Sequence, residues 1–221
     1  MEALHDVDPH VRFVTGKVLV LLVDQDETED AEGAGLANQS EFVALDGVEQ
    51  TLEAALAAEE AHVRTVLMCL LGVVSGFVFG RARLAVADGR NALFVLTQAL
   101  ECDYGDECKE NALWVATNLV RGDPALQRTA CAAGLPRLAA ELCEDVAAPP
   151  QLLSLAACAL AQLAAGPESW ADVLEENGLE ARPPPPAPRE QSAPPCRRQR
   201  APAAPRLAEP PARAAVGAGD R

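Results

Sequence analysis

The amino-acid sequence predicts an all-α protein built from repeated helical units. Two series of glycines recur at nearly constant intervals. The first has intervals of 42, 45 and 44 residues and consists of Gly47, Gly89, Gly134 and Gly178. The second has intervals of 46 and 44 residues and consists of Gly76, Gly122 and Gly166. Two independent series with one period indicate an internal repeat, and periods of about 40 to 47 residues are typical of helical solenoids.

The composition favours the same fold class. The 221 residues are 49% hydrophobic but only 4% aromatic, and isoleucine is absent. A core of Ala, Leu and Val side chains suits closely packed helices, whereas the β-branched and aromatic runs that favour strands are few. The chain is long enough for one ordinary domain or a short repeat array.

The expected elements follow in order. The first is a helix that begins at Pro9 and ends near Gln25, with a strand as the alternative because this segment is so apolar, and residues 26–35 form a solvated acidic loop. Short helices are expected at 41–46, 83–88, 127–133 and 170–177. Medium helices are expected at 48–58, 90–101 and 135–144, and long helices at 60–75, 107–121 and 152–165. The glycines stand at helix ends, where a residue that tolerates positive φ is favoured.

The long helix at 107–121 carries an unusual pair of side chains. Trp114 and Asn118 are one helical turn apart, beside the apolar face of the helix, so they share one patch of surface. A large aromatic side chain next to an amide suits an extended peptide, because it offers apolar contact and main-chain hydrogen bonds together. The alternative is a half-buried Trp and a solvent-facing Asn without a binding role.

The segment from Asn111 to Leu142 resembles armadillo-repeat proteins. It reads Asn-Ala-Leu-Trp-Val-Ala-Thr-Asn-Leu, then Gly-Asp-Pro, then Ala-Gly-Leu-Pro-Arg-Leu, and is most similar to the importin-alpha style of repeat. The resemblance implies a right-handed α-solenoid of about three three-helix repeats over residues 39–181, with incomplete terminal repeats. Residues 1–38 then contain a partial first-repeat helix and the acidic loop.

The same resemblance implies a peptide-binding site. Trp114 would cover the aliphatic stem of a Lys or Arg on the bound peptide, and Asn118 would bond the peptide backbone. The corresponding positions in the next and preceding units are Cys158 and Gln162, and about Met68 and Gly72, so the pair occurs in one unit. Glu107 and Glu110 precede the pair. They complement the helix dipole, and on a concave surface they would also attract basic side chains.

Charge separates the body of the chain from its tail. Residues 1–180 carry 10 basic and 30 acidic side chains, whereas residues 181–221 carry 8 arginines and 3 acids. An acidic body disfavours nucleic acid and anionic membranes and favours basic partners, although the acids also serve simply to keep an apolar helical array soluble. Residues 182–221, rich in Pro, Arg and Ala, are expected to be disordered or polyproline-like.

The sequence offers no pattern for catalysis, a cofactor or a metal. The three histidines have no Ser or Cys partner in a recognisable arrangement, and Cys102 and Cys108 have no His near them. Seven scattered cysteines favour reduced thiols in the cytoplasm or nucleus, and the acidic N-terminus is unlike a secretory signal. The apolar run from Thr65 to Gly80 is shorter than the roughly 20 residues of a bilayer span.

We therefore expect a non-enzymatic scaffold or adaptor that binds an extended, basic peptide, with a role in protein transport or nuclear import. The alternative is a structural or regulatory scaffold that associates through its repeat ends. The repeat pattern stops near Glu180, as in a segment or alternative form of a longer array, and an uncapped end would expose Leu163, Trp170 and Leu174. A third possibility is a membrane-attached protein that uses Thr65–Gly80.

Overall fold

The computed structural model describes residues 1–24, 34–86 and 89–165. Contacts divide the chain into two units, Met1–Ala181 and Arg182–Arg221, and every described residue belongs to the first. Secondary structure within the described residues consists of a short 3-10 helix, η1 (Glu2–His5), and ten α-helices. The prediction of an all-α protein is confirmed for this part of the chain.

The helices fall into three sets that recur along the chain. The long set is α1 (Pro9–Val23), α4 (Ala61–Gly76), α7 (Asp106–Val120) and α10 (Pro150–Ala164). The medium set is α3 (Gly47–Ala57), α6 (Gly89–Glu101) and α9 (Leu135–Glu144). The third set is α2 (Ala34–Ala44), α5 (Val78–Val86) and α8 (Pro124–Ala132).

The long and medium helices lie within a few residues of their predicted bounds, and the strand alternative for the first segment is wrong. The third set begins earlier than predicted. In α8 the cause is local: Pro124 occupies the first turn, and the Asp123 carboxylate accepts hydrogen bonds from the backbone N–H groups of Ala125 and Leu126. The predicted helix at 170–177, most of the acidic loop and the tail lie outside the described residues.

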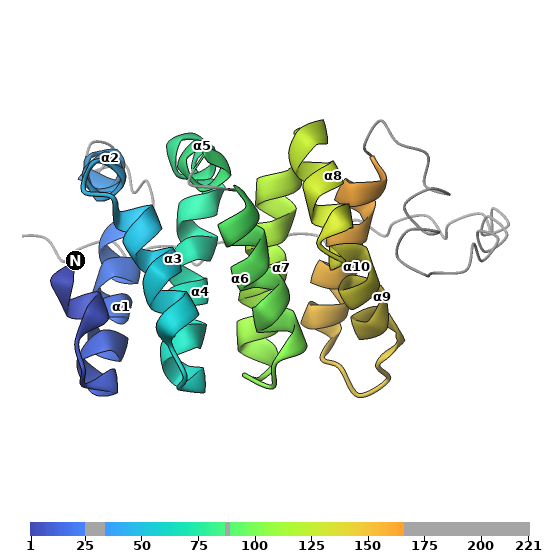
Figure 1. Ribbon diagram of the computed structural model, residues 1–221, viewed down its shortest axis with the longest axis horizontal. Helices are drawn as coiled ribbons and strands as arrows, with labels where there is room; N and C mark the ends of the chain where they lie inside the picture. Colours follow the sequence, from blue (N-terminus) through green and yellow to red (C-terminus); the bar gives the residue numbers. More distant parts are fainter. Residues whose placement is uncertain (25–33, 87–88, 166–221) are drawn as a thin grey trace, which may run out of the picture. The chain divides into compact units, whose positions relative to one another are not determined.

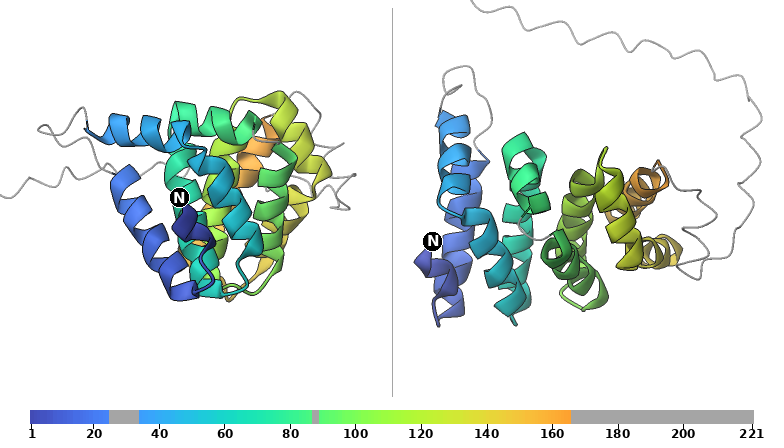
Figure 2. Two further views of the ribbon diagram at one scale, coloured as in Figure 1. Left: turned by 60° about the vertical axis from the view of Figure 1, so that its left-hand side comes forward. Right: turned by 45° about the horizontal axis from the view of Figure 1, so that its top comes forward.

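The long helices, and likewise the medium helices, pack against each other in sequence order. Each of α1, α4, α7 and α10 contacts the next, and α3, α6 and α9 form a second series. Within a unit, the medium helix packs against the long helix that follows it. Figure 1 shows the colours advancing steadily from α1 to α10, and Figure 2 shows the same order from two further directions.

Positive backbone φ angles occur at two of the glycines that mark the repeat. Gly122 has φ of 71° and Gly134 has φ of 82°, in the turns before α8 and α9. In the preceding unit the left-handed residue is Asp46, with φ of 54°, and Gly47 already belongs to α3. Gly47 is needed there for space, because a Cβ atom would lie 2.6 Å from the carbonyl oxygen of Phe42.

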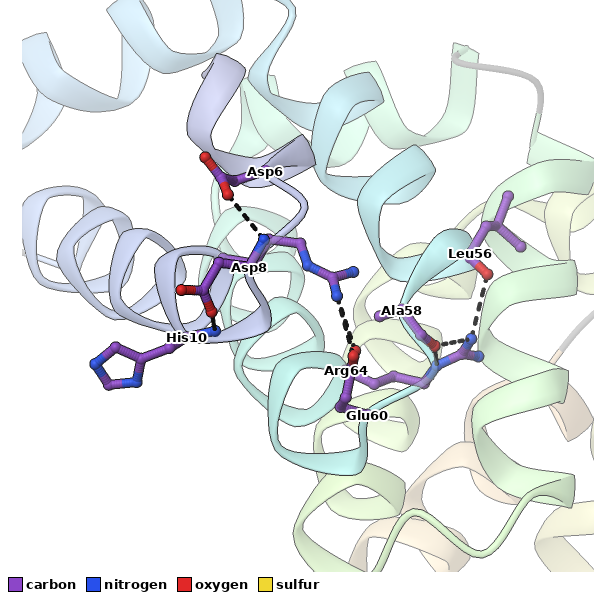
Figure 3. A network of polar contacts seen from close by, with 8 residues as sticks. Asp6, Asp8, His10, Leu56, Ala58, Glu60 and Arg64 are labelled. Carbon is purple, nitrogen blue, oxygen red and sulfur yellow. Dashed lines mark hydrogen bonds and ion pairs between the residues drawn. The ribbon is translucent and has the colours of Figure 1, made fainter.

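Helix α4 is the most enclosed element, and two arginines fasten its N-terminal end (Figure 3). Arg12 of α1 donates two hydrogen bonds, of 3.1 and 3.0 Å, to the Glu60 carboxylate. Arg64, only 2% exposed, donates to the carbonyl oxygens of Leu56 and Ala58 at the end of α3. The start of α4 is therefore tied to both α1 and α3.

The length and apolar character of the helices bear on the membrane alternative. Among the described residues, no individual helix combines the length and apolar character needed to cross a bilayer. Helices α4 and α5 reach that threshold only when taken together, as a pair bent by 113°.

Candidate functional site

One face of α7 carries all four predicted site residues and lies alongside α4. Trp114 contacts Gly72, Asn118 bonds Ser75, and Glu107 borders a hollow that also contains Thr65 and Cys69. Residue numbers rise together along both helices, so α4 and α7 run parallel. The candidate site is thus a surface shared by two neighbouring long helices.

Trp114 rests against α4 while part of its ring faces solvent. A Cβ atom at Gly72 would lie 2.7 Å from Cε3 of the indole, so the glycine makes room for the ring. The side chain remains 38% exposed. Since the indole is held in place on one side and open on the other, it offers a fixed apolar surface to a ligand.

Asn118 is buried, in contrast to both sequence-based interpretations of this residue as a surface group. It is 7% exposed, and its Nδ2 donates a 3.0 Å hydrogen bond to Oγ of Ser75. The Ser75 hydroxyl in turn donates a 2.7 Å bond to the carbonyl of Gly72. The structure therefore does not present Trp114 and Asn118 as an exposed pair, and Asn118 links α7 to α4 about one helical turn further along both helices.

The two predicted acids lie toward the N-terminal end of the same face. Glu107 is exposed in the first turn of α7, where its charge complements the helix dipole. Glu110 is half-buried, and its pKa is raised by partial burial and by the negative charges of Asp106 and Glu107. This end of the surface carries a concentrated negative charge that a bound cation would relieve.

A hollow of about 590 Å³ lies next to these acids, between α1 and α4. Its walls combine apolar side chains with a few polar ones, and its lining is Phe13, Lys17, Val20, Leu21, His62, Thr65, Val66, Cys69 and Glu107. The sequence does not predict this hollow, because its lining residues come from three helices. How those helices are aligned with one another is not encoded in any local sequence pattern. The only available signal was Glu107, already predicted to attract basic groups.

The thiols near this surface are poor nucleophiles. Burial raises the pKa of Cys108 to about 11, and the pKa of Cys69 is raised by burial and by the charges of Asp24 and Glu107. Both therefore stay protonated at neutral pH, whereas nucleophilic cysteines need a lowered pKa. In the part of the chain that the structure describes, no three His, Cys, Asp or Glu side chains gather into a group that could hold a metal ion.

Comparisons with known proteins identify a similar fold and no family. No family model and no curated protein matches this chain. A crystal structure of an engineered protein from a structural genomics consortium has a TM-score of 0.63 and 18% identity, covering 80% of this chain and 64% of its own length. A second engineered protein has a TM-score of 0.61 and 18% identity, covering 80% of this chain and 39% of its own length. This chain thus spans less than two thirds of either, and at such identity the likeness shows only a fold of packed helices.

Proposed function

We propose that this protein is a non-enzymatic, armadillo-type solenoid that binds an extended, basic peptide across its long helices. The observation that carries the proposal is the half-exposed indole of Trp114, held on Gly72 beside a cluster of acids. The repeated glycines and the serial packing of the long helices α1, α4, α7 and α10 support the solenoid. Its right-handed twist and its division into about three repeats belong to the same proposal.

The chemistry of the surface fits a Lys or Arg side chain. The open face of Trp114 can cover the aliphatic stem and attract the cation. The charges of Glu107 and Glu110 complement the cationic end. Asn118 is buried and contributes indirectly, because its hydrogen bond to Ser75 holds α7 against α4 and so helps to fix the indole.

The cellular role that follows from the resemblance to importin-alpha repeats is an adaptor in protein transport or nuclear import. Such a role places the protein in the cytoplasm, the nucleus or both. The partner would be a protein segment that remains extended and basic, which the acidic body of residues 1–180 also favours over nucleic acid.

Replacing Trp114 with Ala is expected to weaken binding of a fluorescein-labelled, ten-residue Lys/Arg-rich peptide about tenfold, the effect typical of an aromatic anchor. Fluorescence anisotropy at constant ionic strength measures the dissociation constant. Phe94→Ala is the matched control, because Phe94 is 58% exposed but lies on α6. Equal affinities for the wild-type and Trp114→Ala proteins would refute the peptide surface.

A second candidate function is self-association, which the exposed face of α1 favours. Val14, Val18 and Leu22 recur at helical spacing and are 45%, 49% and 45% exposed. The sequence-based expectation at the other end of the array is wrong for Leu163, which is 2% exposed on α10, while Trp170 and Leu174 lie outside the described residues.

If α1 mediates self-association, the full chain sediments as a dimer at micromolar concentration, and replacing Val18 and Leu22 together with Glu yields a monomer. Charged side chains at these positions oppose apolar contact while remaining in solvent, so the fold itself should persist. Circular dichroism checks the helical content of the variant. A wild-type protein that sediments as a monomer throughout this concentration range would exclude the α1 interface.

A further inference from the structure

The hollow between α1 and α4 has a cation on one wall and an anion on the other. Lys17 of α1 is held at the first wall, with its Nζ 4.7 Å from the centroid of the Phe13 ring. Glu107 of α7 borders the opposite wall, since α4 packs between α1 and α7. The lining between the two charges is largely apolar and includes Val20, Leu21 and Val66.

Close packing fixes the floor of this hollow. A Cβ atom at Gly16 would lie 2.8 Å from Cγ1 of Val66, so α1 and α4 approach each other closely at this point. The Phe13 ring meets the His62 ring edge-on, at 5.3 Å between centroids. A volume of about 590 Å³ lies within the range of preformed ligand sites.

We propose that this hollow binds a peptide segment in which a basic, an apolar and an acidic side chain follow in that order along the array. The basic side chain pairs with Glu107, the apolar one packs on Val66 and Leu21, and the acidic one pairs with Lys17. This inference rests on the proposed function, because the segment belongs to the same peptide that crosses the surface near Trp114. It adds a specificity for the order of charges that a purely acidic surface lacks.

The spacing of the three side chains follows from the helix packing. Neighbouring packed helices have axes about 8 to 10 Å apart. An extended chain in the polyproline II conformation advances about 3.1 Å per residue and has three residues per turn, so every third side chain lies on one face and the chain passes from one helix to the next in about three residues. The three recognised side chains are therefore separated by about three positions each.

Two fluorescein-labelled peptides of identical composition test the order of the charges on the full chain. One has Arg, Leu and Asp at three-residue intervals in a Gly/Ser/Thr background, and the other places Asp between Arg and Leu. We expect the first to bind about tenfold more tightly, as is usual when a charged contact and an apolar contact are both aligned. Equal affinity of the two peptides would overturn the proposed order.

Protein variants then assign the preference to the hollow. Lys17→Glu makes both walls acidic, so the variant should prefer a peptide with Arg in place of Asp, whereas Lys109→Glu changes the net charge equally without touching the lining. Leu21→Ser should weaken binding of the Arg-Leu-Asp peptide severalfold. Leu45→Ser is its control, because these leucines are 72% and 56% exposed and only Leu21 lines the hollow.

Binding that depends on Trp114 but is unchanged by Lys17→Glu and Leu21→Ser would overturn this inference and leave the proposed function standing. Absence of binding by any basic peptide would overturn both.

Discussion

Replacing Arg64 with Met is expected to lower the free energy of unfolding by about 3 kcal/mol, because buried carbonyl acceptors lose their donors at about 1 to 3 kcal/mol each. The guanidinium donates to Ala58 at 2.8 Å, to Leu56 at 3.3 Å and to Oε1 of Gln98 at 2.8 Å. It also stacks on Tyr104, 4.4 Å from the ring centroid. Methionine fills a similar volume but can satisfy none of these oxygens.

The Arg64 guanidinium contacts the C-terminal end of α3, which explains why the expected loss of stability is large. The last carbonyls of a helix have no donor within the helix, and positive charge is favourable there. Arg64 supplies both, and through Gln98 it connects this end to α6. One side chain on α4 thus joins α3 and α6, which belong to neighbouring helical repeats.

Urea unfolding followed by circular dichroism measures the change for Arg64→Met. The control is Arg137→Met, at a residue 44% exposed that pairs with Glu101 and Glu141 on the surface and should cost less than about 1 kcal/mol. Similar unfolding midpoints for both variants would show that removing a buried charge offsets the unsatisfied carbonyls, an outcome known for some buried ion pairs.

Much of the helical framework could be predicted from sequence because its boundaries are encoded locally. Glycines with positive φ and prolines in first turns mark where α8 and α9 begin, and apolar periodicity supplies what lies between. The starts of α2 and α5 have no such local marker, so the sequence predicts them too late. Helix α2 begins at Ala34, seven residues before the predicted position 41, and α5 begins at Val78, five residues before the predicted position 83.

The site was predictable only where it depends on one helix. Helical spacing predicts that Trp114 shares its helix with the preceding acids Glu107 and Glu110, and the structure shows that all three lie on one face of α7. The burial of Asn118 depends on the register between α4 and α7, which local spacing does not contain. Trp114 contacts Gly72, whereas the repeat interval aligned it with about Met68, so contacting positions differ from equivalent positions by one helical turn. Gly72 and Ser75, two small residues three positions apart in a largely apolar helix, are the sequence signal for this contact between α4 and α7.

The first turn of α5, where it packs against the end of α4, is the position where a single added methyl group should destabilise the fold most. Gly80 is buried, and a Cβ atom there would overlap with the carbonyl oxygen of Val74 and lie 2.5 Å from its Cγ1. That oxygen cannot move away freely, because it accepts the hydrogen bond from the N–H of Phe77 that ends α4. We expect Gly80→Ala to lower the free energy of unfolding by about 3 kcal/mol, the upper end of overpacking costs.

Gly76→Ala provides the matched comparison, four residues earlier in the same segment. Gly76 is exposed at the end of α4, and a Cβ atom there would meet no atom within 4 Å. Alanine is about 1 kcal/mol better than glycine inside a helix, so this variant should be as stable as wild type or more so. Opposite shifts of the urea midpoint for the two variants would establish close packing of the α4–α5 turn. A wild-type midpoint for Gly80→Ala would instead mean that α5 can move away from α4, and contacts that α5 makes with α2, α3 and α6 would then fail to fix its position.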